Sequence, residues 1–374
     1  MTAALLTCAA APPAFADDAV SFSVEYTGDV VGPIAGAQRR GQYLDNLDLS
    51  ATFDMQKLVG WGDTTVFLHV LNNSGGTPND AAQTLQGVDN IEVTRQSARL
   101  YEFWIETNLG PINTRAGLYD INSEFYANDS AGLLMAPAFG IGSELAATGP
   151  NGPSIFPSTA LAARFSTQLS PHGSARVAIV NANAGVIGDP DGVDTQFDDG
   201  ALIIGELSWN GRTSVDVGAW TYTDKQDDIR LVDGSGDAIS QRAAGAYISA
   251  EREIWTDATV FARVGLSDGD TTPYVGGWQA GVLFTNVIPS RADSQLSIGA
   301  YQGRFGSKFR ANQRDDGLNA SSAETGIELT YSDQVTPWLR LQPDVQVVLD
   351  PNGDRDRQEL WTAGLRFTIA PFGH

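Results

Sequence analysis

Residues 201–222 read ALIIGELSWNGRTSVDVGAWTY, and this stretch contains the pattern that decides the fold. Its second half alternates two kinds of residue, apolar Val215, Val217 and Ala219 with polar or small Ser214, Asp216 and Gly218. A period of two predicts a β-strand with one apolar and one polar face. The segment Trp209-Asn210-Gly211-Arg212 precedes this strand, and Asn-Gly favours a tight hairpin turn. The stretch therefore predicts two antiparallel strands that are joined directly.

The same alternation runs through nearly the whole chain, and helical periodicity is almost absent. Cutting the chain at turn signals predicts sixteen strands, most of them near the roughly 9–11 residues that a tilted strand needs to cross a bilayer. They lie near residues 19–27, 43–55, 63–72, 98–108, 112–118, 159–169, 174–183, 200–210, 212–222, 240–254, 257–267, 275–288, 293–304, 321–332, 336–349 and 358–369.

The connections between these strands alternate in length. Tight turns are predicted at 109–111, 170–173, 209–212 and 288–291. Long loops are predicted at 28–42, 73–97, 119–158, 184–199, 223–239 and 305–320, and shorter ones at 268–274 and 351–357. This rhythm is typical of a transmembrane up-and-down antiparallel β-barrel with turns at one rim and loops at the other. The predicted fold class is therefore all-β.

The charged strand residues fall almost wholly on the polar face. They are Glu25, Asp48, Glu102, Glu106, Arg115, Arg164, Arg176, Glu206, Asp216, Glu251, Arg263, Glu328, Arg340, Asp344 and Arg366. Burying so many charges in a dry core costs several kcal/mol each even after partial pairing, so a water-filled lumen is expected. The nine acids and six bases among them suggest a weak preference for cations. Aromatic residues near strand ends predict interfacial girdles, with Tyr26, Tyr101, Phe103, Trp209, Tyr331, Trp338, Trp361 and Phe367.

Charge and cysteine content exclude several classes of protein. A net charge of -22 over 374 residues argues against nucleic-acid binding, which needs clustered Lys and Arg. Cys8 is the one cysteine and lies in an apolar N-terminal run that ends at Ala14-Phe15-Ala16, the pattern of a signal-peptidase site. We therefore expect a signal peptide over residues 1–16 and a barrel domain over 17–374. No later stretch is apolar for about 18 residues, so no transmembrane helix is expected.

Several segments resemble the carbohydrate-selective porins, the glucose-inducible outer-membrane porins of Gram-negative bacteria. The most specific is AETGIELTYSDQVTPWLRLQPDVQVVLDPNG at 323–353, with its Thr-Pro-Trp and Leu-x-Pro-Asp-x-Gln segments. Residues 47–71, 100–106 and 116–141 are similar to the early hairpin and to the region around the constriction, and the terminal LWTAGLRFTI resembles the closing strand. The resemblance covers the chain from about residue 20 onward. The ending Phe372-Gly373-His374 departs from the terminal aromatic residue that is usual in the family.

The resemblance implies passive, sugar-favouring diffusion across the bacterial outer membrane, through a barrel narrowed by an inward-folded loop at 119–158. Candidate constriction residues are Glu102, Trp104, Arg115, Asp120, Glu124, Glu144 and Arg164, and further lumen candidates are Asp48, Arg340, Asp344 and Arg366. Charged groups hydrogen-bond sugar hydroxyls and an aromatic face stacks on a pyranose ring. The alternative is that the charges pair with one another and pin the loop. The partners implied are permeating sugars, outer-membrane lipid and the barrel-assembly machinery; a homotrimer and a monomer both stay open.

Other functions are less well supported. His69, His172 and His374 lack metal-ligand spacing, and no serine carries a nucleophile motif, so an outer-membrane enzyme is disfavoured. No cofactor is expected. The segments at 189–192 and 350–354 are faintly similar to calcium loops but lack the glutamate at the twelfth position, which leaves a surface calcium as the alternative. A porin for other small polar or charged solutes is the runner-up, and an adhesin on a similar barrel is the alternative outside transport.

Overall fold

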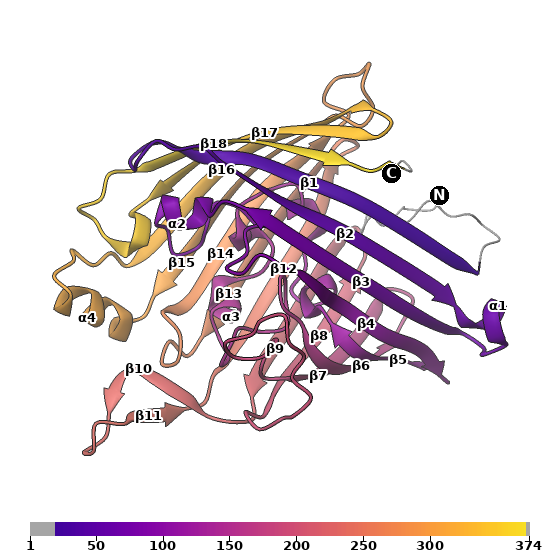
Figure 1. Cartoon of the computed structure of the whole chain (residues 1–374), viewed down its shortest axis with the longest axis horizontal. Helices are drawn as coiled ribbons and strands as arrows, with labels where there is room; N and C mark the ends of the chain where they lie inside the picture. Colours follow the sequence, from indigo (N-terminus) through magenta and orange to yellow (C-terminus); the bar gives the residue numbers. More distant parts are fainter. Residues whose placement is uncertain (1–18, 372–374) are drawn as a thin grey trace.

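The computed structural model describes residues 19–371, and within them sixteen strands form one closed antiparallel barrel. The predicted leader and the terminal segment 372–374 lie outside the described residues. Strands that follow one another in sequence are neighbours in the barrel, and β18 closes it by pairing with β1. One neighbouring pair of this described barrel, β9 and β12, is not consecutive, because β10 and β11 form a separate hairpin outside it (Figure 1). The prediction of a sixteen-stranded up-and-down barrel is confirmed.

The barrel strands have the following bounds: β1 (Val20–Ala35), β2 (Gln42–Asp54), β3 (Thr64–Gly75), β4 (Ala98–Leu109), β5 (Ile112–Tyr119), β6 (Ala160–Gln168), β7 (Gly173–Asn181), β8 (Ala201–Asn210), β9 (Thr213–Tyr222), β12 (Ala244–Trp255), β13 (Ala258–Ser267), β14 (Tyr274–Thr285), β15 (Gln295–Phe305), β16 (Ala323–Thr336), β17 (Leu339–Leu349) and β18 (Leu360–Ile369). The separate hairpin consists of β10 (Gln226–Val232) and β11 (Ala238–Gln241).

The two ends of the barrel differ in the length of their connections. One end has short turns, as at 110–111 and 211–212, and a helix α1 (Met55–Val59) between β2 and β3. The other end has the long loops, which contain α2 (Pro78–Ala82), the β10–β11 hairpin and α4 (Ser307–Asp315), as Figure 1 shows. We call these the turn end and the loop end. Among residues 19–371, no helix is long and apolar enough to cross a membrane.

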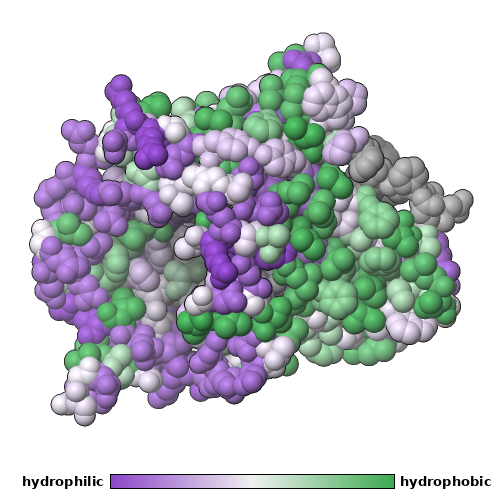
Figure 2. Space-filling model, viewed as in Figure 1, coloured by the Kyte–Doolittle hydropathy of each residue, from purple (hydrophilic) through white to green (hydrophobic). Residues whose placement is uncertain are grey.

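The two faces of the strands differ as the alternation predicts. Large apolar side chains on the outside are open to the surroundings, among them Phe22 at 64%, Leu207 at 59% and Val217 at 50% exposed. Figure 2 shows apolar residues gathered over the strands and hydrophilic residues over the loop end. The strand registers place the fifteen predicted charged residues on the inner face; Glu25 opposes Asp48, and Glu106 opposes Arg115.

The first predicted loop is wrong, because β1 continues to Ala35 and leaves only residues 36–41 as a connection. Gly28, Asp29 and Pro33 suggested a loop at 28–42 from their turn propensity. In the barrel, Asp29 is paired with Arg366 across the closing seam, and a side chain at Gly28 would collide with the Phe367 ring. Cross-strand pairing therefore overrides local propensity here.

The prediction that Tyr101 belongs to an outer girdle is also wrong. The register between β3 and β4 shifts between His69 and Val70, which leaves an extra residue on β4. Such a bulge turns Tyr101 inward. Its ring lies edge-on to His69 at 5.2 Å, and its hydroxyl donates to the Asp120 carboxylate.

Candidate functional site

The connection between β5 and β6, residues 120–159, folds into the barrel rather than away from it, and we call it L3. It contains three 3-10 helices, η1 (Ile121–Ser123), η2 (Asp129–Ala131) and η3 (Pro137–Phe139), and the short α3 (Ser143–Ala146). Its apolar residues Ile121, Phe125, Tyr126 and Leu145 are at most 1% exposed. These side chains pack against inward residues of β6–β9 and β12, so L3 has a core of its own inside the lumen.

One buried arginine on the far wall holds the middle of L3. Arg263 on β13 is 1% exposed and donates to the carbonyl oxygens of Tyr126 at 2.7 Å and Gly140 at 3.0 Å. It also donates to the carbonyls of Ala138 and Phe139. A guanidinium with five N–H donors suits this role, because it satisfies several buried backbone acceptors at once.

Carboxylates on the barrel wall accept hydrogen bonds from backbone amides of the same loop. Glu206 on β8 accepts from the Tyr126 amide at 3.0 Å, and Glu328 on β16 accepts from the amides of Met135 and Ala136. Each of these carboxylates therefore binds L3 at a different strand of the barrel. Charged acceptors make stronger hydrogen bonds than neutral ones, which favours a fixed loop position.

Small residues in the wall leave room for the loop. A Cβ added at Gly265 would lie 1.7 Å from the Glu144 carboxylate, and one at Gly299 would lie 2.6 Å from the Phe139 ring. Glu144 is 1% exposed and accepts from the Tyr126 hydroxyl. Burial raises the pKa of Glu144. The predicted constriction residue Glu144 therefore lies buried between the loop and Gly265 of the wall, and its hydrogen bond to Tyr126 is internal to the loop.

A second loop also folds inward, and the sequence did not indicate it. Residues 76–97, which we call L2, follow β3; the amides of Leu85 and Gln86 donate to the Glu324 carboxylate at about 3 Å. Two residues further along the loop, the Val88 carbonyl accepts a hydrogen bond from the Gln346 side chain at 2.8 Å. L2 and L3 meet where the Ser143 hydroxyl donates to Gln86 at 2.9 Å. Together the two loops are hydrogen-bonded to inner-face side chains of β8, β13, β16, β17 and β18.

The opposite wall, β1 to β7, carries several partly exposed charges, and we call it the uncovered wall. The side chains of Asp48, Glu106 and Arg176 are 26%, 24% and 23% exposed, whereas Glu324 and Glu328 beneath the loops are 0% exposed. The charges beneath the loops are therefore closed to water, whereas several on β1–β7 are not; Asp216, Glu251 and Arg340 on other strands are also partly exposed.

Four charged groups form a network on this uncovered wall. Glu106 Oε2 accepts from Arg164 Nη2 at 2.7 Å and from Arg115 Nε at 2.9 Å. Glu124, from the start of L3, accepts from Arg164 Nη2 at 3.1 Å and lies 3.7 Å from Arg115 Nη2. Burial raises the pKa of Glu124, but the neighbouring guanidinium groups outweigh this effect and lower it. Two acids and two bases thus join three strands to the loop.

An aromatic pair adjoins this network. The Arg115 guanidinium lies over the Trp104 ring at 3.9 Å, and the rings of Trp104 and Phe67 stack at 4.9 Å between centroids. Both rings are partly exposed on the inner face of β3 and β4. The wall therefore offers an apolar ring surface directly beside paired charges.

A second polar group lies nearby, around the first residue of L3. Glu102 accepts from the Asp120 amide at 3.1 Å, and His69 lies between Asp48 at 2.9 Å and Glu102 at 3.8 Å. Burial and the neighbouring Glu102 charge raise the pKa of Asp120 to about 7. Tyr101 donates to this carboxylate and His69 faces it, which both oppose the rise.

The remaining predicted lumen residues lie on the strands that close the barrel. Arg366 on β18 binds Asp29 at 2.7 Å and Asn90 of L2 at 2.7 Å, and Asp344 on β17 accepts from Gln346 at 2.9 Å. Arg340 donates to Ser332 at 3.2 Å. None of these contacts belongs to the Glu106 network, so the predicted set divides among several places on the inner wall.

The residues that sequence reasoning left out of the site are the anchors beneath L2 and L3. Arg263, Glu206 and Glu328 were assigned to the inner face by alternation, but alternation gives no information on which inner charge meets a loop. Glu324 and the inward course of L2 carried no distinguishing pattern. Within residues 19–371, no group of three or more His, Cys, Asp or Glu side chains is arranged to hold a metal ion. In the suggested calcium loop, Asp189 and Asp191 lie instead against Arg95.

Comparison with known proteins adds an independent result. Residues 38–370 match the family model described as the carbohydrate-selective porin, OprB family. The chain is 22% identical over 395 residues to Porin B of Pseudomonas aeruginosa, covering 92% of this chain and 86% of that protein. It is 21% identical over 377 residues to a protein of Acinetobacter baylyi described as "Putative porin QuiX", covering 86% and 82%.

Solved structures show the same fold. The high-pH structure of Pseudomonas putida OprB superposes with a TM-score of 0.84 at 20% identity, covering 95% of each chain. The outer membrane channel DcaP of Acinetobacter baumannii gives a TM-score of 0.58 at 12% identity, covering 94% of this chain and 96% of that chain.

Proposed function

Because this chain belongs to the carbohydrate-selective porin, OprB family, and is an outer-membrane channel for carbohydrates, we propose that its sugars permeate along the β1–β7 wall, past Trp104 and the Glu106 network. The turn end then faces the periplasm and the loop end faces the cell exterior, as in other bacterial barrels. A sugar that enters from outside passes between this wall and L3.

The observation that carries the proposal is the adjacency of the Trp104 ring to four paired charges. A pyranose has an apolar ring face and a rim of hydroxyls, and each hydroxyl both donates and accepts hydrogen bonds. The Trp104–Phe67 pair is partly exposed and offers an apolar contact surface for the ring face. Glu106 and Arg115 lie beside it and supply acceptors and donors for the rim. The site thus matches both parts of a sugar.

The balance of charge in the network favours neutral solutes. Glu106 and Glu124 formally cancel Arg115 and Arg164, and all four groups are already engaged with one another. An ion that displaced one partner would leave another charge partly buried without its counter-charge, which is costly. A neutral sugar adds hydrogen bonds at the rim of the network without breaking its pairs.

The test is the block of ion current by sugar in planar bilayers, with Trp104→Ala compared against wild type. We expect glucose to reduce the current of wild type and its residence time to fall about threefold to tenfold in Trp104→Ala, because one ring contact is worth roughly 0.5–1.5 kcal/mol. Trp104→Phe retains a ring and should restore most of the effect.

Trp209→Ala is the matched control, because Trp209 is 53% exposed on the outer face at the turn end. It should leave sugar block unchanged. Equal block in Trp104→Ala and wild type would contradict the proposed path. Block by succinate in place of glucose would favour the runner-up, a channel for small charged solutes.

A further inference from the structure

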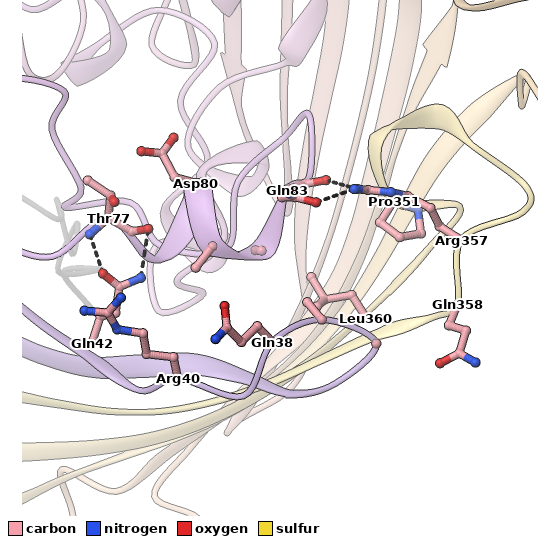
Figure 3. A pocket seen from close by; sticks show the side chains of 14 residues that line it. Gln38, Arg40, Gln42, Thr77, Asp80, Gln83, Pro351, Arg357, Gln358 and Leu360 are labelled. Carbon is pink, nitrogen blue, oxygen red and sulfur yellow. Dashed lines mark hydrogen bonds between the residues drawn. The ribbon is translucent and has the colours of Figure 1, made fainter. Parts of the chain in front are cut away.

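A cavity of about 660 Å³ lies at the loop end, outside the path described above. It is enclosed by three segments: residues 36–41, which we call L1, the helix α2 at the start of L2, and residues 350–359, which we call L8. Figure 3 shows α2 on one side of this cavity and L1 on the other. Its volume falls within the roughly 300–1,000 Å³ of typical small-molecule sites.

The frame of the cavity is fixed by hydrogen bonds between these segments. The Gln42 side chain bonds both backbone groups of Thr77, donating to the carbonyl at 3.0 Å and accepting from the amide at 2.9 Å. On the other side, Arg357 of L8 donates to the Gln83 carbonyl at 2.9 Å and to its side-chain oxygen, as Figure 3 shows. Both ends of α2 are therefore held, one by β2 and one by L8, and the cavity is preformed.

Within this frame, some polar groups have no hydrogen-bond partner among the described residues. Gln38 and Arg40 of L1 are exposed and make no hydrogen bond or ion pair within residues 19–371. Figure 3 places the Gln38 amide between L1 and α2. The base of the cavity is apolar, with Ala82 at 2% and Leu360 at 1% exposed. The cavity thus presents free amide and guanidinium groups above a tightly packed apolar base.

We propose that this cavity is a capture site for neutral oligosaccharides at the mouth of the channel, with Gln38 and Arg40 binding sugar hydroxyls. The inference rests on the proposed function. Planar amide and guanidinium groups present paired donors or acceptors that match neighbouring hydroxyls of a sugar. An anion would compete for Arg40, but the lining also contains the Asp80 carboxylate, and the amides of Gln38 and Gln358, which take no part in the frame, favour a neutral polyhydroxyl ligand.

The position of the cavity gives capture a role in transport. L1 joins β1 and β2, whose inner faces carry the partly exposed Glu25 and Asp48 of the uncovered wall. L2 continues from α2 into the lumen, where Gln86 meets L3 at Ser143. A sugar held between L1 and α2 therefore lies above the same side of the barrel along which we route permeation. Capture there raises the local concentration of sugar at the entrance.

The experiment measures sugar-induced blocking events in single channels of known orientation, with maltotriose added to one side at a time. The variant is Gln38→Ala/Arg40→Ala. We expect the association rate from the loop side to fall about threefold or more, because two side chains that bind hydroxyls are lost. The association rate from the turn side and the duration of each event should not change.

Arg39→Ala is the matched control, because it removes the same charge from the same loop at a residue that does not line the cavity. A second variant, Ala81→Trp, fills the cavity from α2 and should reproduce the loss from the loop side. Sodium phosphate up to the sugar concentration should leave the association rate of maltotriose unchanged.

The outcomes separate this inference from the proposed function. If wild type shows no sugar block from either side, the proposed path along β1–β7 fails. If block is normal but Gln38→Ala/Arg40→Ala and Ala81→Trp keep the wild-type rate from the loop side, the capture site is overturned. An equal loss in Arg39→Ala, or competition by phosphate, also overturns it, because the effect is then one of charge.

Discussion

At the scale of the residue, the inner wall uses one chemical group for two purposes. Arg263 is almost fully buried and donates hydrogen bonds to loop carbonyls. Arg115 lies over Trp104 and shares the Glu106 carboxylate with Arg164. Both are arginines on the polar face of a strand, and alternation does not distinguish them. Their neighbours decide the difference: Arg263 lies beneath L3, and Arg115 lies on the uncovered wall. The first role holds L3 in place, and under the proposed function the second contributes to the contact with sugars.

Asp120 gives a prediction at this scale. Its pKa in the folded chain is about 7, through burial and the Glu102 charge, and lies above the value near 3.9 of an unfolded aspartate. The folded loop therefore binds the proton more tightly than the unfolded chain does. The stabilisation of the start of L3 is complete below about pH 4 and is lost as the pH rises toward 7.

Amide hydrogen exchange over residues 120–125 checks this prediction, with protection corrected for the intrinsic rate at each pH. Protection should decrease from pH 5 to pH 8 in wild type. Asp120→Asn should show no such decrease, because an amide keeps an acceptor for the Asn122 amide without a titrating charge. A decrease of the same size in Asp120→Asn would assign the pH dependence to another group, with His69 as the first to examine.

At the scale of the element, L3 behaves as a part of the wall rather than as a surface loop. Glu206 on β8, Arg263 on β13 and Glu328 on β16 bind it from well-separated strands. Its aromatic residues also dock on the wall, as when Tyr126 stacks on Tyr247 at 3.8 Å. These contacts from separate strands fix the position of the loop inside the barrel.

Arg263→Met tests this arrangement. It leaves carbonyls of L3 without their donor, and each unpaired buried acceptor costs about 1–3 kcal/mol. We expect L3 amides to exchange at least tenfold faster, ion current to become larger and noisier, and sugar block to weaken, while the strands keep their protection. Arg340→Met is the control, since Arg340 is also an inner-wall arginine but bonds Ser332 on the neighbouring strand. Equal loop exchange in the two variants would show that Arg263 does not hold L3.

At the scale of the whole molecule, the sequence predicts the barrel better than it predicts the lumen. Alternation and turn residues suffice for the sixteen strands, because each strand must present one face to lipid and pair its backbone internally. They fail at β1, where Asp29 and Gly28 suggested a loop, and at Tyr101, where a bulge reverses the side chain. The inward fold of L2 depends on Glu324 receiving two amides from residues some 240 positions away in sequence. No local pattern encodes such a contact.

The seam between β1 and β18 supplies the last prediction. Closure of the barrel brings Asp29 and Arg366 together, with the Arg366 Nε and Nη2 atoms 2.7–3.1 Å from the carboxylate oxygens and Asp29 0% exposed. Arg366→Met leaves this buried carboxylate without its partner. Breaking a buried ion pair in this way typically costs about 3–5 kcal/mol, and we expect the free energy of unfolding to fall by that order. Arg366→Met/Asp29→Leu removes both charges and should recover most of the loss, because an apolar pair of similar size is often neutral or stabilising.

The heat-induced loss of the compact, fast-migrating form on gels measures this, since it reports opening of the closed barrel. We expect a clear drop in the midpoint temperature for Arg366→Met and a midpoint near that of wild type for the double variant. We expect this drop because a closed barrel has no free edge, and its first and last strands must therefore be joined as firmly as any other pair. If the double variant were as unstable as Arg366→Met, the seam would depend on the link from Arg366 to Asn90 of L2 instead of on its ion pair. In that case the inward loop, and not the pairing of charges, would be what completes the ring.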